Sequence, residues 1–121
     1  MIGLSFKTGT DDLRESPLVL LAEHFIGKGY TILVYDPEVH LSTLLGANRR
    51  YIEQHLPHIG SLIRNDIAAV IADSDVLVVG LGEPGVVDAL TRHTRPEQTV
   101  VDLIRIADRK ALRGDYVGLC W

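Results

Sequence analysis

The clearest pattern in the chain is an apolar stripe at helical spacing near its N-terminus. The stripe consists of Leu18, Leu21, Ala22, Phe25 and Ile26. Ser16 precedes it as a capping residue, and Pro17 suits the first helical position, where a missing N–H group costs nothing. Gly29 can end the helix in a left-handed conformation. The pattern therefore predicts one helix between Ser16 and Gly29.

Short runs rich in β-branched and aromatic residues predict the strands. They cover residues 4–6, 30–35, 76–79, 99–103 and 116–119. Leu4, Ser5 and Phe6 are expected to form only the end of a strand. The run from Val76 to Val79 is apolar at every position, which is expected of a central strand that is covered on both faces.

Further helices are expected between these strands. One is capped by Asn65 or Asp66 and carries Ile67, Val70 and Ile71, and another opens at Pro84 and carries Val86, Val87 and Leu90. Between residues 40 and 64 the pattern is weaker. Residues 41–45 suggest a short helix that stops at Gly46, and residues 51–56 suggest a second one that ends before Pro57.

This alternation of strands and helices is typical of an α/β domain. Strand–helix–strand units cross over with a right hand and build parallel sheets, so we expect an open parallel sheet. The 121 residues fit one domain, which we expect to span residues 1–121. Apolar residues make up 46% of the chain and charged residues 23%, a balance that allows a hydrophobic core.

Charge and hydropathy exclude several classes of partner. A net charge of −4 argues against a general binder of nucleic acids or of anionic membrane surfaces. No apolar run approaches the ~20 residues of a membrane span, and no signal peptide is recognisable. The single cysteine, Cys120, excludes an intramolecular disulfide and fits a reducing compartment. We therefore expect a cytoplasmic protein with no nucleic-acid or membrane partner.

Ligands of open parallel sheets bind beyond the carboxyl ends of the strands, where helix N-termini offer unpaired N–H groups. Four segments of this chain are expected there: residues 7–15, the turn Asp36-Pro37, residues 80–85 and the surroundings of Asp102. The first combines Lys7 and Arg14 with two threonines and a glycine, which together could hold a phosphate-bearing ligand. The alternative is a solvated loop in which acidic neighbours neutralise both cations in surface ion pairs.

Residues 80–85 have the form G-x-G-x-x-G of a dinucleotide fingerprint. However, Glu83 places a carboxylate where a pyrophosphate would lie, and Pro84 removes an N–H donor from the start of the helix. We therefore favour a tight strand-to-helix turn over a nucleotide site.

No catalytic or metal-binding residue is expected. Nothing near Cys120 in the sequence would lower its pKa, so a structural role is expected for it. His55 and His58 are separated by Pro57, which breaks the helix that would align them as metal ligands. Asp11 and Asp12 are adjacent and would point in different directions, which argues against a carboxylate pair.

The run GLSFKTGTDDLRESP (residues 3–17) resembles the segment that opens the C-terminal domain of the UDP-glucose/GDP-mannose dehydrogenase family. The similarity continues through short motifs along the rest of the chain. They are GKGY (27–30), GAN (46–48), YIE (51–53), DSDV (73–76), VDL (101–103) and the final CW (120–121), an ending similar to that of GDP-mannose dehydrogenases. UDP-glucose members of the family carry an arginine two residues after the aspartate that ends the strand. Here Ile104 stands at that position and the nearest arginine is Arg105, which favours the GDP-mannose branch.

The resemblance implies that the chain is a fragment of a longer enzyme, preceded by an NAD-binding Rossmann domain and a central helical domain with the catalytic cysteine. It implies a three-layer sandwich with a Rossmann-like, five-stranded parallel sheet of order 3-2-1-4-5. Lys7 would contact the sugar nucleotide, and Phe6 would line the same site. Arg14 would reach the NAD, which the N-terminal domain mainly binds. The full-length enzyme is expected to be a homo-oligomer.

The function implied by the resemblance is binding of a nucleotide sugar within an NAD-dependent 6-dehydrogenase of polysaccharide biosynthesis. That enzyme would oxidise the C6 alcohol of GDP-mannose to the carboxylate of GDP-mannuronate in two steps, and the isolated domain is not expected to be catalytic. Two alternatives stay open: a stand-alone nucleotide-binding module built on residues 80–85, and an assembly domain without a ligand.

Overall fold

The computed structural model describes residues 1–39 and 46–119. The helix expected at residues 41–45 and the final Cys120-Trp121 lie outside these ranges. The described helices are α1 (Pro17–Gly27), α2 (Gly46–His55), α3 (Ile59–Leu62), α4 (Ile67–Ala72) and α5 (Pro84–His93), followed by a 3-10 turn at Arg109–Ala111. The strands are β1 (Val76–Val79), β2 (Thr99–Asp102) and β3 (Asp115–Gly118).

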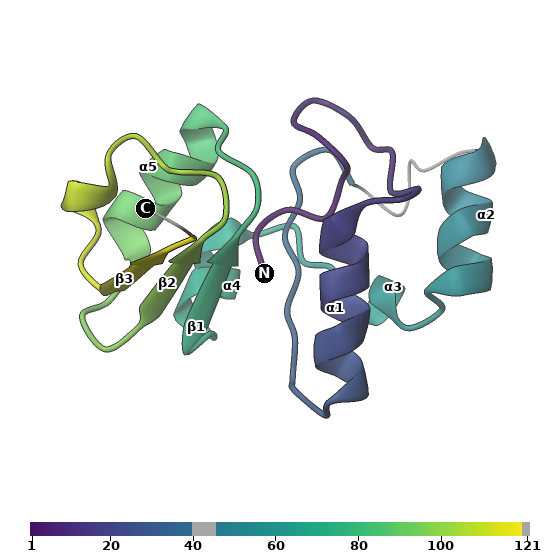
Figure 1. Ribbon diagram of the computed structural model, residues 1–121, viewed down its shortest axis with the longest axis horizontal. Helices are drawn as coiled ribbons and strands as arrows, with labels where there is room; N and C mark the ends of the chain where they lie inside the picture. Colours follow the sequence, from purple (N-terminus) through teal and green to yellow (C-terminus); the bar gives the residue numbers. More distant parts are fainter. Residues whose placement is uncertain (40–45, 120–121) are drawn as a thin grey trace.

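The strands form a parallel sheet in the order β1-β2-β3, so the prediction of an α/β fold with a parallel sheet is confirmed (Figure 1). Beyond β1, single-residue bridges continue the parallel pairing. Ile2 pairs with both Val79 and Tyr35, and Val34 pairs with Ile63. The order 3-2-1-4-5 of five full strands stays a prediction.

No strand forms at residues 4–6, so the prediction of a strand end there is wrong. Of the strand predicted at residues 30–35, only the single-residue bridges of its last two residues form. The reason lies in the hydrogen bonds of the segment. Leu4 and Ser5 donate their backbone N–H groups to the carboxylate of Asp36, at 2.8 Å each, instead of to a neighbouring strand. The extended part of the N-terminal segment is therefore centred on Ile2, earlier than its apolar pattern suggested.

The helix boundaries follow the local signals of the sequence. The Ser16 side chain accepts a hydrogen bond from the Leu18 N–H group at 3.3 Å, and Gly29 follows the end of α1 with a φ of 84°. Asp66 caps α4 by accepting from the N–H groups of Ala68 and Ala69. The helix expected at residues 51–56 is the second half of α2, which begins earlier, and α3 was not expected.

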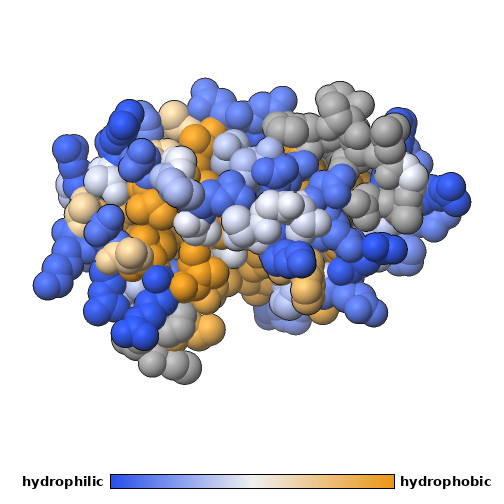
Figure 2. All heavy atoms as spheres, turned by 90° about the horizontal axis from the view of Figure 1, so that it is seen from above, coloured by the Kyte–Doolittle hydropathy of each residue, from blue (hydrophilic) through white to orange (hydrophobic). Residues whose placement is uncertain are grey.

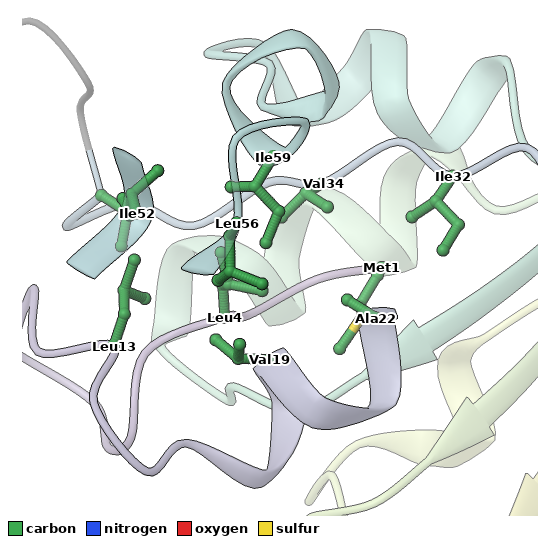
Figure 3. Packing of buried hydrophobic residues seen from close by; sticks show 11 residues of the cluster. Met1, Leu4, Leu13, Val19, Ala22, Ile32, Val34, Ile52, Leu56 and Ile59 are labelled. Atoms are coloured by element: carbon green, nitrogen blue, oxygen red, sulfur yellow. The ribbon is translucent and has the colours of Figure 1, made fainter. Parts of the chain in front are cut away.

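Two hydrophobic clusters lie on the two sides of the N-terminal segment. One joins α1, α2 and α3 (Figure 3), and the other joins α4 and α5 to the sheet. Met1 and Leu4 belong to the first cluster, while Ile2, between them, is fully buried in the second. A fully buried side chain of this size stabilises the fold by about 1.5–3 kcal/mol. The first residues of the chain therefore connect the two halves of the molecule seen in Figure 1.

Candidate ligand-binding edge

The four segments expected at the carboxyl ends of the strands do meet at one edge of the molecule. A Cβ atom added to Gly3 would lie 2.7 Å from the Leu81 side chain, so the loop after Ile2 touches the turn after β1. A Cβ atom on Gly82 would lie 2.6 Å from Ile104, which follows β2. Figure 2 looks down on this edge and shows a hydrophobic band in the half that holds β1 to β3, with hydrophilic side chains around it.

Buried hydrogen bonds fix both ends of the loop that carries the expected site residues. Asp36, which is only 2% exposed, receives the N–H groups of Leu4 and Ser5 on one carboxylate oxygen and that of Glu38 on the other. The Ser16 hydroxyl donates to the Leu4 carbonyl at 2.7 Å. The two ends of the loop are thus fixed next to each other, which limits the positions that its outer part can take.

The outer part of this loop exposes the expected substrate-binding side chains. The Phe6 N–H group donates to the Asp12 carbonyl at 2.9 Å and closes the loop. Phe6 is 59% exposed, which is unusual for an aromatic ring, and Lys7 beside it is exposed as well. An exposed ring next to an ammonium group suits a ligand that combines a flat base with phosphates.

Arg14, the residue expected to reach a cofactor, is held by Asp12. Its Nε and Nη2 atoms donate to the two carboxylate oxygens at 2.9 Å each, and its backbone N–H group donates to Oδ1 at 3.0 Å. These hydrogen bonds, first of all that from the guanidinium, lower the pKa of Asp12 to about 2. Arg14 thus forms one of the surface ion pairs that the alternative of a solvated loop describes. Its side chain is still 56% exposed, which leaves other N–H groups open to a ligand.

Sequence reasoning missed the backbone conformation of two residues on this edge. Glu15 and Arg105 have φ angles of 57° and 64°, in the left-handed region that costs a residue with a side chain about 1–2 kcal/mol. Glu15 comes directly before the cap of α1, and Arg105 lies in the loop after β2. No residue type in the sequence signals either conformation, because neither is a glycine or an asparagine.

Asp102 was expected near a ligand, but its carboxylate is used by the protein itself. It is fully buried and accepts the N–H groups of Ile104, Arg105 and Ile106 as well as the hydroxyl of Tyr116. Burial by itself raises the pKa of Asp102, but the hydrogen bonds from Tyr116 and the backbone outweigh it, so that this pKa lies below its ordinary value. Both aspartates of the edge, this one and Asp36, therefore shape loops.

Two of the three glycines in residues 80–85, Gly80 and Gly82, have a packing role. A Cβ atom on Gly80 would lie 2.6 Å from the side chain of Leu18 in α1, and Gly82 makes room for Ile104. Glu83 stands at the N-cap of α5 without a side-chain capping bond, and Pro84 follows it. These contacts explain Gly80 and Gly82 without a pyrophosphate and support the turn that the sequence favoured.

Other kinds of site are not found in the part of the chain that the structure describes. A hollow of about 580 Å³ lies between α5 and residues 105–111, and none of Phe6, Lys7 and Arg14 lines it. Its charged lining residues are exposed, so we do not place the site there. Residues 1–39 and 46–119 hold no cluster of metal-binding side chains and no helix that is long and apolar enough to cross a membrane.

Comparison with known proteins shows which family has this domain. The family model for the UDP-binding domain of UDP-glucose/GDP-mannose dehydrogenases matches residues 1–109. The GDP-mannose 6-dehydrogenase of Pseudomonas aeruginosa is 46% identical over 121 residues, which are all of this chain and 27% of that protein. The enzyme of the same name from Azotobacter vinelandii is 39% identical over the same length.

A solved structure gives the same result. The crystal structure of a ternary complex of GDP-mannose dehydrogenase from Pseudomonas aeruginosa matches 99% of this chain and 27% of its own, with a TM-score of 0.81 at 46% identity. The chain thus spans about a quarter of the length of the relatives that it matches. This chain belongs to the UDP-glucose/GDP-mannose dehydrogenase family.

Proposed function

We propose that this chain is the sugar-nucleotide-binding domain of an NAD-dependent GDP-mannose 6-dehydrogenase. The complete enzyme would oxidise the C6 alcohol of GDP-mannose to a carboxylate in two steps, and NAD would accept the hydride in each. The observation that carries the proposal is the 46% identity with the Pseudomonas aeruginosa enzyme across the whole chain.

We assign the contacts with the ligands to the loop of residues 6–14. Lys7 would pair with the phosphates of the sugar nucleotide, and Phe6 would pack against another part of it. Both side chains are exposed beside a loop whose two ends are fixed, so binding would cost little additional ordering of the backbone. The roles of Lys7 and Phe6 therefore depend on a loop that is formed before the ligand arrives.

Arg14 is the residue of this chain that would contact NAD. Its guanidinium is already oriented by the carboxylate of Asp12 and keeps exposed N–H groups, which fits a planar donor for a phosphate. NAD would supply the hydride acceptor, and the remaining part of the polypeptide would bind most of it. The enzyme would act in the cytoplasm as a homo-oligomer, in polysaccharide biosynthesis.

The proposal includes a five-stranded sheet in the order 3-2-1-4-5. If the segments at Ile2, Val34-Tyr35 and Ile63 are positions 1, 2 and 3, and β1 and β2 are positions 4 and 5, the parallel pairs have the neighbours that this order requires. β3 then pairs with β2 as a sixth position at the edge of the sheet. In such sheets the first strand lies in the centre, and ligands bind beyond its carboxyl end. The loop of residues 6–14 follows this central position directly.

Steady-state kinetics of the longer natural polypeptide test these roles. Lys7→Ala should lower kcat/KM for GDP-mannose ten- to a hundredfold, and Arg14→Ala should lower kcat/KM for NAD by a similar factor. The reason is that a charge-assisted hydrogen bond contributes about 1.5–3 kcal/mol. Lys28→Ala, at the C-cap of α1, and Arg92→Ala, on α5, remove the same charges from exposed positions and serve as controls.

The 121-residue chain alone should not reduce NAD with GDP-mannose, and turnover by the pure chain would contradict its role as one domain of a larger enzyme. If Lys7→Ala and Arg14→Ala behave like the two controls, the loop is solvated surface and the assignment of these residues is wrong.

A further inference from the structure

The sheet has one covered face and one open face. Residues alternate between the faces of a strand, and paired residues of parallel strands share a face. Leu77, Val79 and Val100 face α4 and α5 and are fully buried. The open face carries the alternate residues in the same register. They are Val76 and Val78 of β1, Thr99 and Val101 of β2, and Asp115 and Val117 of β3, followed by Leu119.

This open face is apolar and poorly covered. Val76, Val117 and Leu119 are 51%, 52% and 56% exposed. In Figure 1, α4 and α5 lie behind the sheet, and within the described residues no helix crosses in front of β2 and β3. Parallel sheets in α/β proteins are covered on both faces, because exposed strands of this composition lose the free energy of apolar burial. The exposure therefore indicates a missing layer.

Val78 is partly buried against the cluster of α1 to α3, so the uncovered part of the face begins beside it. We propose that this part, formed by Val76, Val101, Val117 and Leu119, is the docking surface for an amphipathic helix from the rest of the longer polypeptide. The inference rests on the proposed function, in which this chain is one domain of a longer enzyme. The relative from Pseudomonas aeruginosa has nearly three quarters of its length outside the matched region, so ample chain exists to supply such a helix.

The dimensions and charges of the face specify the helix. Three neighbouring strands lie about 4.8 Å apart and together span roughly 10 Å, which is the width of one helix with its side chains. Asp75 and Asp115 are exposed at the end of the face where the strands begin. The docked helix should therefore present apolar residues to Val101 and Val117, and a lysine or arginine near Asp115. A second copy of this chain fits less well, since each copy carries a net charge of −4.

Cysteine accessibility tests the proposal. Val117→Cys and, as a second variant, Val76→Cys are placed in a Cys120→Ser background, both in the 121-residue chain and in the longer natural polypeptide. Arg92→Cys, exposed on the helix that covers the opposite face, is the control. A maleimide reagent labels each protein, and mass spectrometry of the peptide that contains the introduced cysteine gives the rate at that site.

In the 121-residue chain, the labelling rates of Val117→Cys and Val76→Cys should equal that of Arg92→Cys. In the longer polypeptide, the labelling rates of Val117→Cys and Val76→Cys should fall at least tenfold, while that of Arg92→Cys should stay the same. Equal rates for the face residues in both proteins would overturn the proposal. Protection that already appears in the short chain and grows with its concentration would also overturn it, because a second copy would then be the occupant. Reduction of NAD by the unmodified longer protein with GDP-mannose is measured separately and reports on the proposed function alone.

Discussion

At the scale of single residues, Asp12 connects the two ligand-binding parts assigned to the loop. Its backbone carbonyl accepts the N–H group of Phe6, and its carboxylate accepts three N–H groups of Arg14. A change in the position of Asp12 would therefore move both Phe6, which we assign to the sugar nucleotide, and Arg14, which we assign to NAD.

The low pKa of Asp12 provides a direct measure of this connection. In Arg14→Gln the guanidinium is lost while the backbone N–H group remains, so the pKa of Asp12 should rise from about 2 toward its ordinary value, by on the order of one unit. The carboxyl carbon of Asp12, followed by NMR during an acid titration, measures the change. Arg49→Gln, which breaks the exposed pair of Arg49 with Glu53, should leave that titration unchanged.

The amino group of Met1 predicts a dependence of stability on pH for the 121-residue chain. The group donates to the Leu33 carbonyl at 2.7 Å, and burial lowers its pKa from 8.0 to about 6. Between pH 6 and pH 8 the unfolded chain binds more protons at this group than the folded chain does. This group therefore contributes a rise in the free energy of unfolding over that interval, by roughly 2–3 kcal/mol.

NMR titration of the Met1 amine checks the cause of that rise. Its midpoint should lie near pH 6 in native buffer and near pH 8 in urea, and urea unfolding curves at both pH values give the change in stability. A native midpoint near 8 would contradict the assignment.

At the scale of elements, the starts of β2 and β3 depend on one close contact. Asp115 donates its N–H group to the Gln98 carbonyl at 2.9 Å, where the two strands begin. A Cβ atom on Gly114 would lie 2.3 Å from that same carbonyl oxygen and 3.1 Å from that of Arg95. Since both are backbone atoms, a side chain at this position can only be accommodated by moving the strands apart.

Gly114→Ala should therefore destabilise the protein by about 1–3 kcal/mol, the usual cost of forcing additional atoms into a packed site. The control is Gly85→Ala in the first turn of α5, where the added Cβ atom meets nothing within 4 Å and alanine favours the helix. Urea unfolding followed by circular dichroism compares the two variants. Equal midpoints would show that the strands can move apart at no cost.

The sequence predicted elements well wherever the signal was local. Ser16, Asp66 and Pro84 each start a helix as expected, because capping and the fixed φ of proline act within a single turn. The first strand was misplaced because its partners lie far away in the sequence. Ile2 pairs with Tyr35 and Val79, and no pattern within residues 1–6 contains that information.

The difference between local signals and partners that lie far away in the sequence also explains what could be predicted of the candidate site. The position of the edge followed from the alternation of strands and helices, and the motif of residues 3–17 identified the family. The sequence did not predict that the carboxylates of Asp36 and Asp102 accept hydrogen bonds from backbone N–H groups of nearby loops. An aspartate at a strand end looks the same in the sequence whether it binds a ligand or a loop. The roles of Phe6, Lys7 and Arg14 stay predictions until the variants are measured.

At the scale of the whole molecule, Ile2 holds the two clusters together. It is fully buried with α4, α5 and the sheet, while its neighbours Met1 and Leu4 lie in the cluster of α1 to α3. Ile2→Ala should lower the free energy of unfolding by about 2–5 kcal/mol, as for other large-to-small changes in a core.

The loss should affect both halves of the molecule at once. Hydrogen exchange of amides in α1 and in β2 should accelerate together in Ile2→Ala, whereas Leu20→Ala, at a position that is 62% exposed, should change neither by more than a small factor. Faster exchange in only one of α1 and β2 would contradict the role of Ile2 in linking the two hydrophobic clusters.

The central position of Ile2 also has a consequence for synthesis on the ribosome. Its carbonyl receives the N–H group of Gly80, and its own N–H group donates to Val78, so its pairing is incomplete until that stretch has left the exit tunnel. At about 5–20 residues per second, translation of the intervening chain takes roughly 4–15 seconds. During this time the apolar side chains of Met1, Ile2 and Leu4 have only part of their partners. The beginning of this domain is therefore the part that chaperones would be expected to shield longest.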